Sequence, residues 1–213
     1  MARGDWFRNT DWNPEIKANF YKKLARARKK GQYLKIQAYF LSGTFPQVAL
    51  GLLEEYFATG DKFFLASAFV IQASAHLLLG NIEEAFRSYE RALNREKEFP
   101  HAGTEAFVDY PFLVATQRCR ERYDSALEVL RGEKRGIFRI HAFKREAAFA
   151  LILSDLGNGS AAREHAVAAL TFAEMPDSGL RYHPQLGTVS SAYAPVCAQL
   201  RKLADSDLSS NRN

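Results

Sequence analysis

The sequence is poor in cysteine and has no apolar run long enough to cross a membrane. Only Cys119 and Cys197 occur in 213 residues, and their separation fits neither a metal site nor a redox motif. Such sparse cysteine is typical of a reducing compartment, so we expect a cytoplasmic protein stabilised by packing. The longest apolar stretch, FFLASAFVI at 63–71, is far shorter than the roughly 20 residues of a membrane-spanning helix. The amino-terminal MARGDWFRNTDW is charged where a secretory signal is apolar.

Motifs for catalysis or cofactor binding are also missing. No His-Glu-x-x-His run occurs, and the histidines show no zinc-ligand spacing. The GNGSAAR stretch at 157–163 lacks the lysine and the preceding strand of a phosphate-binding loop. The adjacent acids Glu54–Glu55 and Glu83–Glu84 point about 100° apart on a helix, so neither pair can flank one reacting bond. We therefore predict no catalytic residue, no metal, no cofactor and no enzymatic activity.

Acidic residues are absent between Glu15 and Glu54, although the formal net charge of the whole chain is only +5. A helix predicted over 14–30 gathers cations on the side opposite Phe20 and Leu24. This basic surface comprises Lys22, Lys23, Arg26, Lys29 and Lys30. It is either a solvated face or a docking surface for an acidic protein or for phosphates. Nucleic acid binding through 17–35 is the alternative, and it requires aromatic residues interleaved with the cations.

Apolar residues recur every three or four positions along most of the chain, which predicts helices. A strand-like stretch, AFVDYPFLV at 106–114, is too isolated to build a sheet, so the predicted fold class is all-α. The expected helices cover 14–30, 32–41, 47–58, 64–79 and 82–97, two short segments within 111–132 that turn near 121–123, two more within 137–175 that join at GNGS, and a terminal segment that contains Pro195.

Four alanines mark an internal repeat. Ala49, Ala85, Ala126 and Ala162 are separated by 36, 41 and 36 residues, and each belongs to the second helix of a predicted pair. Small residues let two helices approach closely, and the neighbouring pair supplies the bulk of the core. Repeats of this length are typical of stacked helix hairpins, of which at least three are needed for a stable core.

This pattern resembles the tetratricopeptide repeat family. Residues 69–100 match best, through Ala73, Gly80, Ala85, Tyr89 and Ala92, and residues 146–175 follow, through Ala150, Gly157, Ala162 and Ala169. The resemblance implies one domain over 1–205, an α-solenoid of about four hairpins with a core at 31–175. Caps are expected at 1–30 and 176–205, and a disordered tail at 206–213. The chain is also similar to small bacterial proteins of this repeat class.

The resemblance also implies a function, because the first helix of each hairpin in this family lines a concave groove that holds a peptide. The groove-facing residues expected here are Tyr33, Gln37, Phe40, Ser67, Val70, Ser74, Arg118, Lys144 and Leu151. Family members that clamp chaperone tails place asparagines on these helices, and this chain has none there. We expect a scaffold that binds a protein or peptide, an acidic one where the basic surface contributes. An immunity or sequestering protein, an assembly chaperone and a regulator all stay open.

Two further features each have two interpretations. Trp6 and Trp12 either plug the apolar end of the solenoid, as terminal repeats require, or anchor a partner. The loop that carries Arg181, Tyr182 and His183 either fixes the terminal helix or forms a polar binding corner. His76 falls at a helix-packing position, where we expect a structural role.

Overall fold

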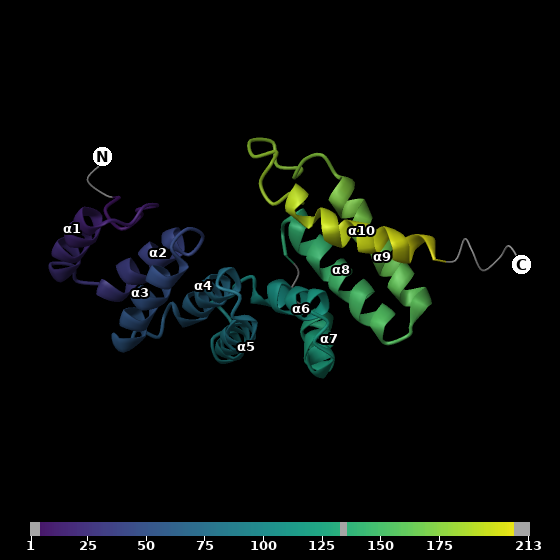
Figure 1. Cartoon of the computed structure of the whole chain (residues 1–213), viewed down its shortest axis with the longest axis horizontal. Coiled ribbons are helices and arrows are strands. Elements are labelled where there is room, and N and C mark those ends of the chain that lie inside the picture. The colour runs from purple at the N-terminus through teal and green to yellow at the C-terminus, as the bar shows by residue number, and fades with distance from the viewer. Residues whose placement is uncertain (1–4, 133–135, 207–213) are drawn as a thin grey trace, which may run out of the picture. The chain divides into compact units, whose positions relative to one another are not determined.

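The chain folds entirely into helices and loops over the part that is described. The computed structural model describes residues 5–132 and 136–206, and these ranges contain no strand, which confirms the all-α class (Figure 1). The residues form two compact units, 1–106 and 107–213. Within the described ranges, no helix combines the length and apolarity needed to span a bilayer.

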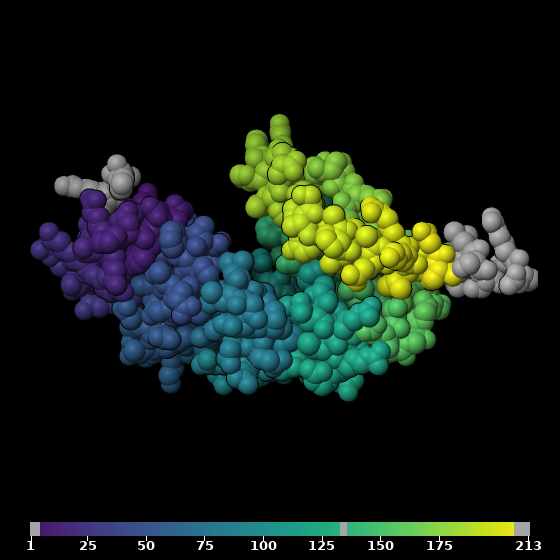
Figure 2. Space-filling view, viewed as in Figure 1, coloured from purple at the N-terminus to yellow at the C-terminus, as the bar shows by residue number. Residues whose placement is uncertain are grey.

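Unit 1 is built from consecutive helices that pack on their neighbours. Helix α2 packs on α3, α3 on α4, and α4 on α5. Helix α1 and the residues before it cover the core formed by α2 and α3, at the purple end of the unit in Figure 2. The bounds are α1 (Pro14–Ala25), α2 (Lys30–Leu41), α3 (Pro46–Ala58), α4 (Leu65–Leu78) and α5 (Ile82–Glu98).

Unit 2 has a hairpin of two long helices, α8 and α9, with α10 packed on both. Lys144 of α8 is ion-paired to Asp109 of α6, and the Tyr110 hydroxyl of α6 lies 2.8 Å from the Ser125 hydroxyl of α7. The bounds are α6 (Ala106–Thr116), which begins at the last residue of unit 1, α7 (Tyr123–Arg131), α8 (Arg139–Asp155), α9 (Gly159–Glu174) and α10 (Ala194–Asp205), with 3-10 turns at Arg120–Arg122 and Ser191–Tyr193.

The four repeat alanines lie at buried helix contacts. Ala49, Ala85 and Ala126 have no exposed surface, and Ala162 is 1% exposed. They belong to α3, α5, α7 and α9, the second helices of the predicted pairs. Because alanine adds only a methyl group, the two backbones of a pair come close enough for larger residues around the contact to interlock.

The repeat glycines have a different role from the one expected. Gly80 and Gly157 are exposed, and a Cβ at either position would meet nothing within 4 Å, so neither permits a close helix approach. Their φ angles are +74° and +82°, which only glycine adopts without strain. Each ends its helix in a left-handed turn, in which the next residue donates a hydrogen bond five residues back, from Asn81 to His76 and from Asn158 to Leu153.

Arginine occupies the same left-handed position at the end of α6. Arg118 has φ +54°, and it is the only non-glycine residue with positive φ in the described ranges. The amide of Cys119 donates to the carbonyl of Val114 at 3.1 Å, the same hydrogen bond that follows Gly80 and Gly157. This turn ends α6 at Thr116, before the turn that was predicted near 121–123.

The helix predicted over 14–30 is correct as far as Ala25 and wrong after it. Helix α1 ends at Ala25, and α2 begins at Lys30. The chain turns between them, and Gly31 then lies close to the loop after α3: a Cβ there would lie 3.1 Å from Thr59 Oγ1 and 3.2 Å from Asp61 Oδ2. The cations of the basic surface therefore do not share one helix face.

Two other local expectations are resolved by the structure. The strand-like stretch at 106–114 is helical, with Pro111 inside α6, because burial of Val108, Tyr110 and Val114 outweighs their strand propensity. Pro195 lies in the first turn of α10 and does not kink it. Residues 207–213 of the expected tail lie outside the described residues. The single domain over 1–205 and the superhelical stacking of its hairpins stay predictions.

Replacement of Arg118 by glycine should stabilise the protein. A left-handed conformation strains a residue that carries a Cβ, so R118G should raise the free energy of unfolding by about 0.5–1 kcal/mol. Urea denaturation checks this value. Gln117→Gly is the matched control. Position 117 has no positive φ, so the glycine should either leave the stability of the protein unchanged or reduce it. A lower stability for R118G than for the wild type would contradict the strain.

Candidate binding surfaces

The first two predicted groove residues are covered by the chain's own N-terminal segment, residues 5–13. Gln37 is completely buried, and its carboxamide holds the backbone of Asn9. The Asn9 amide donates to Gln37 Oε1 at 3.1 Å, and Gln37 Nε2 donates to the Asn9 carbonyl at 2.8 Å. The Asn9 side chain donates to the same Oε1 at 2.7 Å. Gln37 therefore fixes this segment and does not face an open groove.

The tryptophans belong to the same covering contact. Trp6 and Phe7 pack on the ring of Tyr33, with centroid distances of 4.9 and 4.8 Å. Trp6 and Trp12 both contact Phe20, at 5.5 and 5.6 Å. These rings are half-buried and lie against the core of α2 and α3, as a plug over an apolar end would.

The other predicted groove residues of unit 1 are half-buried. Phe40 packs edge-on against Tyr39, which is 61% exposed. The Ser67 hydroxyl donates to the Phe64 carbonyl and the Ser74 hydroxyl to the Val70 carbonyl, so both serines are bonded to their own helix. Only Phe40 and the side chain of Val70 offer apolar contact surface here.

Lys144 forms an internal ion pair in unit 2. Its ammonium lies 2.7 Å from Asp109 Oδ1, and both side chains are largely buried, with exposed fractions of 15% for Lys144 and 16% for Asp109. Burial by itself lowers the pKa of Lys144, but the charge of Asp109, with a contribution from Tyr193, outweighs it and raises the pKa above its ordinary value. Lys144 thus joins α8 to α6, and its charge is already matched.

Arg118 and Leu151, by contrast, line one pocket of unit 2. The pocket has a volume of about 360 Å³ and lies among the end of α6, α8 and α10. Its other lining residues are Ala115, Ser154, Asp155, Gln199, Lys202 and Leu203.

Asp155 is held in this pocket by a neighbouring tyrosine. The Tyr123 hydroxyl donates to Asp155 Oδ2 at 2.7 Å. Burial of the ring, helped by the hydrogen bond to this carboxylate, raises the pKa of Tyr123 to about 12. Asp155 Oδ1 lies 3.9 Å from the guanidinium of Arg118, which is a loose contact.

The basic surface is distributed over three segments of unit 1. Lys22 and Lys23 lie in the last turn of α1, Arg26 is the residue that ends it, and Lys29 and Lys30 begin α2. All five are exposed. None of these five side chains forms an ion pair with a described residue, and neither does Arg28, which lies between Arg26 and Lys29.

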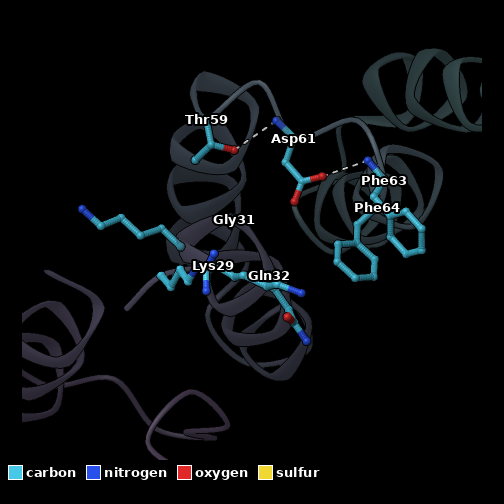
Figure 3. Close-up of a pocket in the computed structure, with 9 residues that line it drawn as sticks. Lys29, Gly31, Gln32, Thr59, Asp61, Phe63 and Phe64 are labelled. Carbon is cyan, nitrogen blue, oxygen red and sulfur yellow. Dashed lines mark hydrogen bonds between the residues drawn. The ribbon is translucent and has the colours of Figure 1, made fainter. Parts of the chain in front are cut away.

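Lys29 and Lys30 lie at a pocket of about 550 Å³, which we call the basic-aromatic pocket. Figure 3 shows Lys29, Gly31 and Gln32 facing it from the start of α2, and Phe63 and Phe64 from the loop between α3 and α4. Its lining residues are Arg28, Lys29, Lys30, Gly31, Gln32, Thr59, Asp61, Phe63 and Phe64. Three cations and one carboxylate therefore surround it.

The loop that carries the two phenylalanines is fixed by hydrogen bonds. The amide of Phe63 donates to Asp61 Oδ1 at 2.8 Å, and the Tyr56 hydroxyl donates to the Asp61 carbonyl at 2.9 Å. Burial is the main cause that raises the pKa of Tyr56 to about 12, so this donor keeps its proton. The backbone of Phe63 is thereby fixed at the pocket, and the side chain is 64% exposed.

The sequence interpretation missed the aromatic half of this pocket. Phe63 and Phe64 were assigned to the apolar run at 63–71, and neither was predicted to contact a partner. The signal that could have separated them is the turn TGDK at 59–62 directly before them, because residues that follow such a turn need not face the core. Gln199 and Lys202 were missed because they belong to the expected C-terminal cap.

Within the described ranges, no group of three or more histidine, cysteine or acidic side chains could hold a metal ion. Cys119 and Cys197 are both free thiols. Burial lowers the pKa of His76, and its buried Nδ1 has no hydrogen-bond partner among the described residues, which agrees with a packing role. In the loop before α10, Arg181, Tyr182 and His183 are all exposed.

A scan against protein-family models, a search of curated proteins and a search of solved structures each found no match to this chain.

Gln37→Ala should detach the N-terminal segment. The substitution leaves the half-buried amide and carbonyl of Asn9 without the partners that Gln37 supplies, so we expect the free energy of unfolding to fall by about 2 kcal/mol. Tryptophan emission should also shift to longer wavelength as Trp6 becomes solvated. The control is Gln47→Ala, an exposed position on α3. Equal stability and equal emission for Q37A and the wild type would show that the clamp contributes nothing.

Stability should fall in strongly alkaline solution. The pKa of Tyr123 is about 12 in the folded chain against 10.0 for the ordinary side chain, so the unfolded state loses its proton first. The stability that Tyr123 contributes is therefore fully present below pH 10, and it is lost as the pH rises towards 12. Tyr123→Phe should show a shallower decrease in urea denaturation series, and Tyr182→Phe, at a ring that is 78% exposed, should follow the wild type. A Y123F curve as steep as that of the wild type would contradict this assignment.

Proposed function

We propose that this chain is a protein-binding scaffold that holds an acidic segment of another protein in the basic-aromatic pocket of unit 1. The observation that carries the proposal is a set of three consecutive cations, Arg28, Lys29 and Lys30, which line one pocket with the exposed Phe63 and have no ion-pair partner among the described residues. The repeat resemblance, which implies a protein-interaction scaffold, points the same way.

Charge favours an acidic occupant. Asp61 is the only acid among the described residues that line the pocket. The sequence between Glu15 and Glu54, from which its three cations come, contains no acid. A partner carboxylate that enters the pocket meets an excess of positive charge, which speeds encounter and selects against basic partners. Exposed cations also keep their hydration until the partner arrives, so the free protein is not destabilised by burying them.

Exposed aromatic rings favour a partner that also carries apolar side chains. Phe63 is 64% and Phe99 37% exposed, and their ring centroids are 6.5 Å apart. Contiguous exposed apolar surface of this kind is typical of interaction sites. The backbone of Phe63 is fixed by its hydrogen bond to Asp61, so little backbone freedom is lost when a partner packs on the ring.

Single-stranded nucleic acid is the second candidate, and one specific observation favours it. Nucleic acid binding through the basic segment requires aromatic residues among the cations, and Phe63 meets that requirement. Bases stack on such rings while lysine and arginine contact the phosphates. The same pocket could therefore hold either occupant, and the experiment has to identify the occupant chemically.

Photo-crosslinking from position 63 identifies the occupant. A benzophenone amino acid replaces Phe63 in the full chain, which is expressed in its native cell and irradiated, and adducts are separated into protein and nucleic acid. We expect a discrete protein adduct whose crosslinked peptide is acidic. Position 182 in unit 2, also highly exposed, is the control. A nucleic acid adduct specific to position 63 would favour the second candidate, and no adduct specific to position 63 would contradict both.

Removal of the three pocket cations should weaken binding of an acidic probe. The variant R28Q/K29Q/K30Q keeps the side-chain stems, and we expect its affinity for a labelled peptide of alternating glutamate and phenylalanine to fall about tenfold or more at low salt. Fluorescence anisotropy measures the affinity. Phe63→Ala should lower the affinity for this peptide more than the affinity for a peptide of glutamate alone, because the ring is expected to contact apolar side chains.

The matched control is R131Q/R181Q/R201Q, which removes the same charge from exposed positions of unit 2. Its affinity should equal that of the wild type. Equal losses of affinity in the two triple variants would mean that the net charge of the protein attracts the probe and that the pocket does not. Tighter binding of an unstructured oligothymidylate than of either peptide would move the assignment to nucleic acid.

A further inference from the structure

The pocket of unit 2 combines an apolar floor with a rim of hydrogen-bond donors. Leu151 of α8 and Leu203 of α10 line it together with Ala115 of α6. Arg118 and Lys202 line it as well, from the end of α6 and from α10. The pocket volume of about 360 Å³ is within the range in which proteins bind small organic molecules.

The polar groups of this rim are not used by the fold. Among the described residues, the side chains of Ser154, Gln199 and Lys202 have no hydrogen-bond or ion-pair partner. Arg118, whose side chain is 72% exposed, has only the loose 3.9 Å contact with Asp155. These four groups all can donate hydrogen bonds, and two are cations, so a ligand with acceptor oxygens and negative charge fits them.

Asp155 is the one acid of the pocket, and it is already engaged. One of its oxygens accepts from the Tyr123 hydroxyl and the other faces Arg118. Its backbone carbonyl also accepts from the guanidinium of Arg120 at 3.5 Å. Asp155 is therefore held mainly by Tyr123 and Arg120, and the rim keeps an excess of one positive charge over its carboxylate.

The backbone at Arg118 gives an independent observation. The equivalent turns after α4 and α8 contain glycine, at Gly80 and Gly157, with the same hydrogen bond from the next residue. An arginine in this left-handed position strains the backbone without improving the turn. Strained residues of this kind occur preferentially where a side chain must be presented to a ligand.

We infer that the pocket of unit 2 binds a small aliphatic carboxylic acid, whose carboxylate is held by Arg118 and Lys202 and whose hydrocarbon part rests on Leu151 and Leu203. Arg118 supplies a paired donor fork that matches the two carboxylate oxygens. Ser154 and Gln199 add neutral donors at the rim. The site lies in unit 2 and does not depend on the protein partner proposed for unit 1.

Calorimetric titration of the full chain with four probes tests the ligand class. Hexanoate carries both the charge and the apolar part, acetate and inorganic phosphate carry only charge, and 1-hexanol carries only the apolar part. We expect one hexanoate to bind per chain, at least tenfold more tightly than each of the other three, since two buried methylene groups already correspond to about tenfold. Equal binding of acetate or hexanol would overturn the inference.

Substitutions then locate the site. Arg118→Gly and Lys202→Gln should each weaken hexanoate binding at least tenfold, and Arg131→Gln, an exposed control on α7, should not change it. R118G removes the guanidinium but relieves the backbone, so a loss of binding in that variant cannot be attributed to poor folding. Hexanoate binding that survives both R118G and K202Q would place the ligand elsewhere and end the proposal.

Discussion

The structure depends on close contact between helices at positions that carry only a methyl group. Ala49, Ala85, Ala126 and Ala162 are all buried in such contacts, and each lets one helix of a pair lie near enough to its neighbours for larger residues to fill the surrounding space. A bulkier residue at any of these contacts would separate the backbones. Hairpins α2–α3, α4–α5 and α8–α9 follow from this one constraint, and so do the loops and helix ends between them, which carry both candidate sites.

Both candidate sites use helix ends, where backbone conformation and side-chain chemistry meet. In unit 1, the start of α2 lies against the loop after α3, because Gly31 leaves room for Thr59 and Asp61. In unit 2, the end of α6 presents Arg118 in a left-handed turn. In each case the fold fixes the backbone while the cationic side chains stay exposed, which is how a rigid scaffold offers charge to a ligand with little loss of entropy.

Some of this could be predicted from the sequence, and the reasons for failure are specific. The alanine spacing and the helical periodicity located nearly every helix, since both are local patterns. Helix α1 was predicted too long because Ala27 continues the apolar stripe, and that local pattern does not show that the chain turns after Ala25. Gln37 was expected to face a groove, but a polar residue on a helix reveals nothing about a segment 28 positions earlier that covers it.

The sequence by itself determined the all-α class, the pairing of helices and the concentration of positive charge before Glu54, because periodicity, small-residue spacing and charge are properties of neighbouring residues. Tertiary structure alone decided which polar side chains form contacts within the chain, as Lys144 does with Asp109. It also decided which of them stay available for a ligand, as Lys202 does. It also placed Phe63 and Lys29 at one pocket, and Leu151 and Leu203 at another. Such contacts join residues far apart in the chain, and their geometry depends on how whole helices pack.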